Sequence, residues 1–519
     1  MEAHTAVSDP PRPAAPGRES SAGPLSPWRR AADSPLLVWT VVSIALAALS
    51  AAIWPTVPSY DPWAWVVWGR EVVDPHLSFV VSGGPSWKPL PVMFTTIFAL
   101  FGGAAPTLWV IAARAGGFLG LAGAFHLARR LTGPGAWGIV AGVVAVVGVV
   151  LTQDWAYYMF RGTSEPLLIA TSLWAIDRGL AGRHVSAFLL AVATCLMRPE
   201  AWPFLILYAI WLWLRRPRLR VLLVAGLLSV PVFWFVPPWI HSGSPFLAAI
   251  HAEEYNGHLG NDPFLTVIGR GVNLQVLPAF IFGLIAGGLA VFSLIRRRAW
   301  TEPRALLRSN DGLILALGAF IVGWWVVVVA MTLDGYPGLE RFFLPAAAAI
   351  CVLAGVGIAR VAQLSGRLLE NLPTARVVVP VAVAGLLIAI SIPFITGRIS
   401  VARAQEPIAA RAATRLNQLT AAVAAVGGHH AVYPCHTSFT AVNHSVQTAL
   451  AWKLHVTLGR VGTTMRHQGL MFVGPHDSID GGPPAVDPRL TQKQLIAHVG
   501  AWRVYRMTSR GADTGCVGR

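Results

Sequence analysis

The sequence predicts an α-helical polytopic membrane protein with about eleven transmembrane helices and a small extracytoplasmic α/β domain at its C-terminus. The chain of 519 residues is 55% hydrophobic and 12% charged, which is about half the charged share of an ordinary soluble domain. Apolar runs long enough to cross a bilayer recur up to residue 396. Beyond that point the sequence becomes polar. These observations together indicate many membrane spans followed by a soluble domain.

The formal net charge of +16 does not indicate a nucleic-acid partner. Such binders carry Lys and Arg as a patch on a soluble fold, whereas here short basic clusters adjoin the apolar runs. They lie at residues 28–30, 129–130, 178–183, 215–220, 296–298 and 360–376. Clusters of this kind mark cytoplasmic loops.

The N-terminal segment, residues 1–34, is rich in Pro, Ala, Ser and Gly without apolar periodicity, so we expect a disordered cytoplasmic tail. The run that follows is too long and too far from the N-terminus for a typical signal peptide. We interpret it as an uncleaved anchor that opens a membrane domain over residues 35–398.

The basic clusters determine the expected membrane topology. If the short run at 89–104 crossed the membrane, Arg129 and Arg130 would lie outside and every later cluster would be inverted. We therefore expect a non-crossing or re-entrant helix there. The expected crossings are 35–54, 107–128, 136–152, 165–180, 185–197, 200–214, 219–240, 275–295, 312–332, 342–361 and 377–396. This topology predicts a plasma-membrane protein with a cytoplasmic N-terminus.

Polar residues concentrate in the predicted external loops. The first loop, 55–106, contains "SYDPWAWVVWGREV" and "SWKPLP". The turn "LMRPEAW" lies below the outer surface, where each charge costs about 2.5–3.5 kcal/mol unless it pairs or meets water. The polar and aromatic residues singled out are Asp61, Trp65, Trp68, Glu71, Lys88, Asp154, Arg161, Glu165, Arg198, Glu200, Glu340 and Arg341.

Each of these features also has a structural interpretation. Asp61 precedes a proline, which is typical of a helix N-cap. The nearby tryptophans favour an amphipathic helix at the membrane interface, and Lys88 or Arg341 can anchor a helix end there. Arg198 and Glu200 can form a structural ion pair.

The order of the motifs resembles the GT-C class of membrane glycosyltransferases. The pattern is an early loop Asp61, then Arg70-Glu71, then Lys88-Pro89-Leu90, continued by "FRGTSEPLLIA" and "ERFFLPA". It is similar to the aminoarabinose and protein O-mannosyl transferases that use polyprenyl-phosphate sugars. Two departures are Leu90 in place of a second proline and Pro62 in place of a second acid, so the paired acidic motif of metal-dependent members is absent. A divalent metal cofactor is therefore possible in principle but not indicated.

The resemblance implies that Asp61 acts at the reaction centre, that Lys88 lies near the lipid phosphate and that Arg341 lies near the donor. An acceptor hydroxyl needs a carboxylate to take its proton, with Asp61 as first choice and Glu71 or Asp154 as alternates. The leaving phosphate needs cations, here Lys88 and Arg341 with Arg161 and Arg198 behind them. Trp65, Trp68, Glu165, Glu200 and Glu340 are expected around the substrate cavity.

The predicted function is inverting transfer of a sugar from a polyprenyl-phosphate donor to a glycan, lipid or protein of the cell envelope. An arabinosyl- or mannosyltransferase would fit this description. The alternatives are a flippase or transporter of lipid-linked glycans, which would use the same charges to bind a passing phosphate, and a non-catalytic subunit that scaffolds envelope synthesis. A nucleic-acid partner is not expected.

The C-terminal domain, residues 399–519, is expected to alternate helices with short apolar strands. Helices are predicted at 408–426, 446–454 and 492–498, with strands at "HAVYPC", "LMFVG" and "AWRVYRM". The external location permits a disulfide between Cys435 and Cys516. The alternative is two free thiols. Separately, Cys435 with His429, His430, His436 and His444 is a candidate zinc site, although the spacing of these residues fits no standard site.

Overall fold

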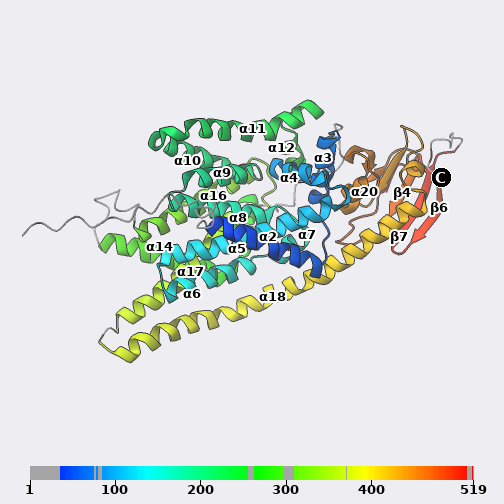
Figure 1. The fold of residues 1–519 in the computed structure, drawn as a ribbon. Coiled ribbons are helices and arrows are strands. Elements are labelled where there is room, and N and C mark those ends of the chain that lie inside the picture. Colours follow the sequence, from blue (N-terminus) through cyan, green and yellow to red (C-terminus); the bar gives the residue numbers. More distant parts are fainter. Residues whose placement is uncertain are drawn as a thin grey trace, which may run out of the picture.

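The computed structural model describes residues 35–74, 77–79, 84–254, 262–296, 309–369, 371–510 and 517. A bundle of helices forms most of the molecule, and a small sheet domain lies at one end of it (Figure 1). In the described ranges, seven helices are long and apolar enough to cross a membrane, or eight if a bent pair is one span. The predicted fold class, a polytopic helical membrane protein with a small C-terminal domain that contains a sheet, is confirmed.

Every expected crossing corresponds to a helix. These helices are α2 (Pro35–Ile53), α5 (Ala105–Thr132), α6 (Ala136–Val150), α8 (Glu165–Leu180), α9 (His184–Cys195), α10 (Trp202–Arg215), α11 (Arg220–Ser242), α14 (Leu277–Arg296), α16 (Asn310–Leu333), α17 (Leu344–Arg367) and α18 (Pro373–Ala425). Four of them, α6, α8, α9 and α10, have 16 residues or fewer. A span of average thickness needs about 20 residues, so the total of eleven crossings stays a prediction.

Helix α17 forms the centre of the bundle, and its most apolar stretch is entirely buried. Small residues allow its neighbours to approach closely, as is usual between membrane helices. A Cβ on Gly355 would lie 2.1 Å from the carbonyl oxygen of Ala141 in α6, and one on Gly357 would lie 2.2 Å from that of Phe282 in α14. Neither glycine can therefore be replaced without separating two helices.

The run expected to be re-entrant is a short helix, α4 (Pro89–Ala99), followed by the single turn η1 (Gly102–Ala104). Eleven residues span only about 16 Å, about half of a hydrocarbon core. α4 packs on α3 (Tyr60–Val73), where a Cβ on Gly69 would lie 2.4 Å from the carbonyl carbon of Thr95. The Thr95 hydroxyl donates to the Trp65 carbonyl at 2.6 Å. These contacts join the first loop into one packed unit.

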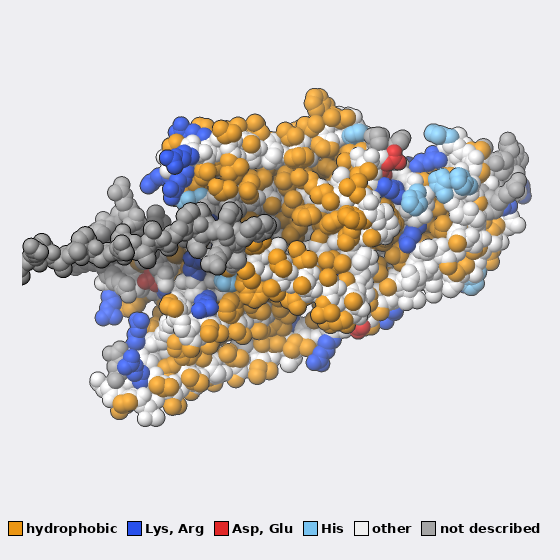
Figure 2. Space-filling model, viewed as in Figure 1, with side chains coloured by type: hydrophobic (Ala, Val, Ile, Leu, Met, Phe, Trp, Pro, Cys, Tyr) orange, Lys and Arg blue, Asp and Glu red, His pale blue; other side chains and the backbone are white. Residues whose placement is uncertain are grey.

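Ion pairs connect the helix ends that carry the basic clusters. Arg130 at the end of α5 lies 2.8 Å from Asp177 of α8. Arg360 of α17 lies 2.5 Å from Asp311 of α16, which also accepts a hydrogen bond from Ser293 of α14. Figure 2 shows a group of Lys and Arg side chains at the end of the bundle away from the sheet domain, with an apolar surface between the two ends.

The C-terminal region begins inside one long helix. α18 has 53 residues and runs along the bundle to the sheet domain (Figure 1). It joins the expected span at 377–396 and the expected helix at 408–426 into a continuous element. The expected domain boundary after residue 398 therefore falls within a helix.

The domain contains a five-stranded sheet in the order β2-β1-β4-β7-β6, in which β1 is parallel to β2 and β4, and β7 is antiparallel to β4 and β6. The elements of the domain, in chain order, are α19 (Gly428–Val432), β1 (Phe439–Val442), η6 (His444–Val446), α20 (Gln447–Lys453), η7 (Leu458–Arg460), β2 (Val461–Gly462), β3 (Thr464–Met465), β4 (Gly469–Val473), β5 (Ala485–Val486), β6 (Gln492–Val499) and β7 (Trp502–Thr508). A short helix outside the domain, α13 (Pro263–Asn273), precedes α14. Strands β3 and β5 form a separate parallel pair.

Two predictions for this domain are wrong. The helix expected at 492–498 is strand β6, because a turn at Gly500, with φ of +57°, folds it back onto β7 as an antiparallel hairpin. Pairing partners override local propensity in such segments. The strand expected at "HAVYPC" is instead the end of α19 and a turn. The expected helix near 446–454 and the strands "LMFVG" and "AWRVYRM" are confirmed as α20, β4 and β7.

The cysteines divide between the bundle and the C-terminal domain. Cys195 and Cys351 are buried free thiols in α9 and α17, the ordinary condition of a cysteine in a membrane helix. Cys516 lies outside the described residues. The disulfide between Cys435 and Cys516 therefore stays a prediction.

Candidate active site

A cavity of about 340 Å³ lies where the helical bundle meets the C-terminal domain. Its wall combines the starts of α3 and α8, the residue before α4, the turn before α10, the loop before α17 and the turn η6. The charged side chains in the wall are Asp61, Lys88, Glu165, Arg198 and Arg341. Five residues singled out from separate stretches of sequence thus line one cavity.

Asp61 is the second residue of α3, and its carboxylate does not act as the N-cap. The N-cap is Ser59, so the structural interpretation of Asp61 as the capping residue is wrong. Its Oδ1 accepts a hydrogen bond from the Ser86 backbone N–H at 3.3 Å. Its Oδ2 lies 3.9 Å from Nη1 of Arg341. The carboxylate is thus held at the cavity wall by the loop before α4.

The tryptophans beside Asp61 are packed inside the protein. Trp63, Trp65 and Trp68 are between 1% and 4% exposed. Trp65 packs edge-on against Trp109 and donates to the Ser86 carbonyl at 2.8 Å. Their interpretation as anchors of an amphipathic interfacial helix is wrong, because α4, α5, the loop before α4 and, at Trp63, Trp452 of α20 cover them. Instead these rings fix the position of the helix that carries Asp61.

Lys88 immediately precedes α4 and is 2% exposed, so it does not reach the interface as a helix anchor. Its Nζ donates to the Ser164 hydroxyl at 2.7 Å and lies 3.4 Å from Glu165 Oε1. It also lies 5.2 Å from the centre of the Trp65 ring. Burial and the neighbouring arginines lower the pKa of Lys88 to about 8, although Glu165 opposes this shift.

Glu165 joins two of the cations. Its Oε1 accepts from Nη2 of Arg198 at 2.7 Å as well as approaching Lys88. Arg198 also lies 3.9 Å from Glu200 and stacks over the Phe342 ring at 4.5 Å. The ion pair expected between Arg198 and Glu200 is therefore the longer of two contacts that Arg198 makes with carboxylates.

Unpartnered donors remain in this cluster. Among the residues that the structure describes, the buried Nε atoms of Arg198 and Arg341 have no hydrogen-bond partner. Three cationic side chains and two carboxylates line the cavity, which leaves an excess of positive charge in a poorly solvated site. Such an arrangement favours an anionic ligand with several acceptor oxygens.

Other residues predicted for the site lie elsewhere. Glu71 accepts from the Ser78 N–H at 3.0 Å and lines a different cavity. Trp68 donates to the Ser78 carbonyl at 3.1 Å. Neither side chain is in the described wall of the Asp61 cavity.

The remaining predicted residues are not in the described wall of the cavity. Asp154 precedes the short helix α7 (Trp155–Arg161) with φ of +59°, and Glu340 lies 3.5 Å from Arg270. Arg161 is joined to the Asp61 helix through its carbonyl, which accepts from the Ser59 N–H at 2.9 Å. Glu200 is fully buried behind Arg198.

The C-terminal domain contributes residues that sequence reasoning did not assign to this site. His444 and Ser445 of η6 line the cavity. The His444 ring stacks on Tyr60 at 4.9 Å, and the Tyr60 hydroxyl donates to Gln447 at 2.9 Å. The sequence contains no local signal for this contact, because it depends on how the domain docks on α3.

The proposed zinc ligands do not form a site in the described part of the chain. No group of three or more His, Cys, Asp or Glu residues there is placed to hold a metal ion. His444 packs against Tyr60, whereas His429 lines the cavity that contains Glu71.

No protein family and no curated protein matches the sequence. The fold is similar to that of ArnT from Cupriavidus metallidurans, solved bound to undecaprenyl phosphate and in the apo state. Both comparisons have a TM-score of 0.49 and 15% identity; they cover 90% and 91% of this chain and 98% of each solved chain. The archaeal oligosaccharyltransferase AglB from Archaeoglobus fulgidus, solved with an inhibitory peptide and a dolichol-phosphate, has a TM-score of 0.38 and 15% identity, over 71% of this chain and 56% of AglB.

Proposed function

We propose that this protein is a GT-C-type membrane glycosyltransferase that transfers a sugar from a polyprenyl-phosphate donor to an acceptor hydroxyl of the cell envelope. The observation that carries the proposal is the shared cavity of Asp61 with Lys88, Arg198 and Arg341. It combines a carboxylate suited to accept a proton with cations suited to a phosphate, at the end of an apolar helical bundle. The motif resemblance implies the same pairing of roles.

The cations fit the leaving group of such a reaction. A polyprenyl phosphate gains negative charge as its bond to the sugar breaks, and fixed cations stabilise that charge in a site that excludes water. The free Nε atoms of Arg198 and Arg341 offer hydrogen bonds that no described protein group takes. Lys88, already held by Ser164 and Glu165, adds a third positive charge.

An apolar groove close to this end of the bundle suits the prenyl chain. It measures about 920 Å³ and is lined by hydrophobic residues and glycines of α13, α14, α16 and α17. Arg270 of α13 donates to the Gly338 carbonyl at 3.0 Å, which joins this helix to the loop that carries Arg341. A donor with its phosphate at Arg341 would thus have an apolar surface nearby for its lipid.

The proposed chemical step is a single displacement. The acceptor oxygen forms a bond to the anomeric carbon while the bond from that carbon to the phosphate oxygen breaks. The electron pair of the broken bond goes to the phosphate, and Asp61 takes the acceptor proton. Attack opposite to the leaving group inverts the anomeric configuration. The transferred sugar and the acceptor are open in this proposal, with arabinose and mannose as the first to test.

The test is transfer by purified protein. We would incubate it with a panel of polyprenyl-phosphate sugars and an envelope extract, and measure released polyprenyl phosphate and new glycoside by mass spectrometry. The proposal requires both products in equal amounts, and their loss in an Asp61→Asn variant. Movement of intact donor across a vesicle membrane without a new glycosidic bond would support the flippase or transporter alternative. Normal envelope synthesis in cells that carry only the Asp61→Asn variant would support the alternative of a non-catalytic scaffold subunit.

A further inference from the structure

A second cavity, of about 560 Å³, lies at the other end of α3, between this helix and the C-terminal domain. Glu71, His429, Tyr433, His455 and Arg460 are among the residues that line it. Asp61 and Glu71 are ten residues apart on α3, which corresponds to about 15 Å along the helix. The second cavity thus lies beside the candidate active site without being part of it.

Glu71 provides the clearest evidence that this cavity binds a ligand. It is 4% exposed, and its Oε2 accepts from the Ser78 N–H. Its Oε1 has no hydrogen-bond partner among the described residues. A buried carboxyl oxygen without a hydrogen-bond partner destabilises the folded protein. Burial also raises the pKa of Glu71 to about 8. The neutral carboxyl can donate from Oε1 and the ionised carboxylate can accept there, so a ligand hydroxyl group, which does both, would remove this destabilisation in either state.

His429 offers a second acceptor. Its Nδ1 lies 2.7 Å from the Leu454 carbonyl oxygen. A carbonyl can only accept, so Nδ1 carries the proton, and Nε2 of the neutral ring has a free lone pair. An acceptor at Nε2 in the same cavity as the Glu71 carboxyl fits a ligand with several hydroxyl groups.

The rest of the wall adds a donor and an aromatic face. The Arg460 guanidinium lies 5.0 Å from the Tyr433 ring centre, and the Tyr433 hydroxyl donates to the Arg460 carbonyl at 2.8 Å. Both arginines in the wall already donate to carbonyl groups. Nη1 of Arg460 donates to the His436 carbonyl at 2.5 Å, and Arg70 donates to the Val456 carbonyl at 2.8 Å and lies over Trp452. A guanidinium has five N–H groups, so Arg460 can still donate to a ligand. Asp74 also lines this cavity beside the two arginines, so the wall has no clear excess of positive charge for an anion. Hydroxyl groups can pair with Glu71, donate to His429 and accept from Arg460.

We infer that this second cavity binds a saccharide, and that it holds part of the acceptor glycan during transfer. The acceptor role rests on the proposed glycosyltransferase function; saccharide binding itself does not. α20 supports the arrangement, because it contacts α3 near both cavities: Gln447 binds Tyr60, and Trp452 binds Arg70. One rigid wall thus places the bound glycan relative to Asp61.

The test compares two adjacent histidines of α19. Both residues are exposed, but only His429 is in the described wall of the cavity. The probe is a set of envelope oligosaccharides, released from source cells by partial acid hydrolysis and added to the purified full-length protein. Saturation-transfer NMR and calorimetry report binding without turnover. We expect His429→Ala and Glu71→Gln to weaken binding at least 10-fold, and His430→Ala to bind within twofold of the unaltered protein.

Transfer assays provide the second measurement. The Michaelis constant for the acceptor should rise about 10-fold in His429→Ala, whereas that for the lipid donor should stay within twofold. Equal binding by all three variants, or no binding by the unaltered protein, would overturn the inference while leaving glycosyl transfer intact. The unaltered protein could instead bind the saccharides, lose this binding in His429→Ala, and form no glycoside in any assay. That result would support the saccharide site and reject the proposed function.

Discussion

The carboxylate of Asp61 lies 3.9 Å from the guanidinium of Arg341, although the two come from the first loop and from the turn before α17. This separation is longer than a hydrogen bond. The fold therefore brings the two opposite charges together without closing them into a tight pair. Within the proposed mechanism, this leaves one oxygen of Asp61 open to an acceptor proton and leaves Arg341 open to the donor phosphate.

The first prediction concerns Asp61 as the base. Asp61→Asn preserves the size of the side chain and an oxygen that can accept from Ser86, but it cannot take a proton at neutral pH. We expect turnover to fall about 100-fold or more, with donor binding changed by less than threefold. Single-turnover transfer and equilibrium binding of the polyprenyl phosphate measure the two effects separately.

Asp334→Asn is the matched control, because Asp334 is an exposed residue at the end of α16 and is not in the described wall of the cavity. It should retain normal turnover. If Asp61→Asn transfers sugar at the normal rate while Asp154→Asn does not, the base is Asp154. The proposed role of Asp61 would then be rejected.

The second prediction is a pH dependence that arises from Lys88. Its lowered pKa of about 8 means that the amine is charged below this pH and neutral above it. The turnover rate divided by the Michaelis constant for the donor reports groups of the free enzyme. We expect this ratio to decrease as pH rises through about 8, because the phosphate loses one counter-charge.

Lys88→Arg keeps a charge throughout this range and should remove the decrease, even if its activity is lower at every pH. Lys88→Met should have a low value of this ratio that does not change with pH near 8. An unchanged decrease in both variants would assign the titration to another group. Glu71, whose pKa is also raised to about 8 by burial, would be the next to test.

The sequence predicted the parts of the molecule that depend on local pattern. The apolar runs expected to cross the membrane all form helices, and apart from the C-terminal end of α18 their ends lie within several residues of those expected, because the apolar run itself marks the helix. Asp61, Lys88, Glu165, Arg198 and Arg341 come together because each is next to the end of a helix or within its first residues. Charges in such places avoid the apolar centre of the bilayer.

The other features depend on packing between distant segments. The tryptophans of α3 have the composition of an interfacial helix, yet α4 and α5 cover them. β6 takes its structure from pairing with β7. His444 reaches the cavity only because α20 docks on α3, as the contact between Thr448 and Tyr60 shows. No pattern within one segment contains this information.

The third prediction tests the expected membrane topology. In a variant without the other accessible thiols, Pro134→Cys, Asp334→Cys and Ser478→Cys place exposed cysteines between α5 and α6, after α16 and in the C-terminal domain. We expect a membrane-impermeant maleimide to label positions 334 and 478 in intact cells, and to label position 134 only after lysis. Labelling of position 134 from outside would mean that α4 crosses the membrane.

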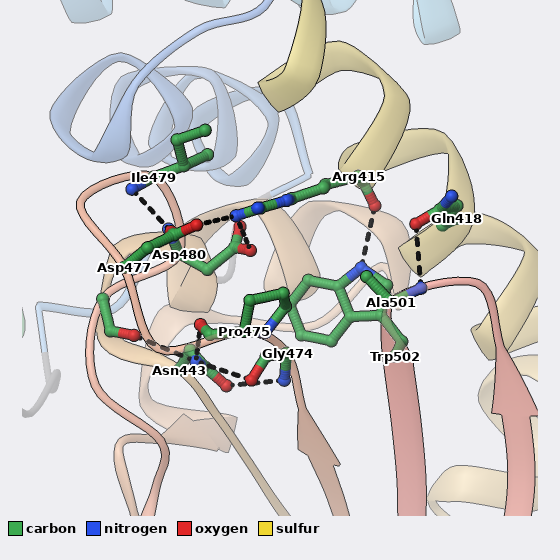
Figure 3. A network of polar contacts seen from close by, with 11 residues as sticks. Arg415, Gln418, Asn443, Gly474, Pro475, Asp477, Ile479, Asp480, Ala501 and Trp502 are labelled. Carbon is green, nitrogen blue, oxygen red and sulfur yellow. Dashed lines mark hydrogen bonds and ion pairs between the residues drawn. The ribbon is translucent and has the colours of Figure 1, made fainter. Parts of the chain in front are cut away.

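The last prediction concerns the contact that holds the C-terminal domain on the long helix α18. Arg415 of α18 lies 2.5 Å from Asp477 and 2.7 Å from Asp480 (Figure 3). Asp480 is 1% exposed, and its carbonyl accepts from the N–H of Ser445, which lines the candidate active site. A single arginine thus connects the end of the membrane helix to the wall of the cavity.

The same region is joined by two further hydrogen bonds, since Trp502 donates to the Arg415 carbonyl and the Ala501 N–H donates to Gln418 (Figure 3). These remain when only the guanidinium is removed. Arg415→Met should therefore leave the sheet folded but leave the buried Asp480 carboxylate without its cation, at a cost of about 3 kcal/mol. We expect faster limited proteolysis at residues 475–481 and a several-fold higher Michaelis constant in the transfer assay.

Arg489→Met is the matched control in the same domain. Arg489 also pairs with an aspartate, Asp487, at 2.7 Å, but its side chain is 82% exposed. Water and salt screen an exposed pair of this kind, so this variant should resemble the unaltered protein in both measurements. Equal behaviour of the two variants would show that the Arg415 contact does not hold the cavity wall. Ser445 would then be positioned by the network around Asn443, whose amide donates to the Pro475 and Gly481 carbonyls.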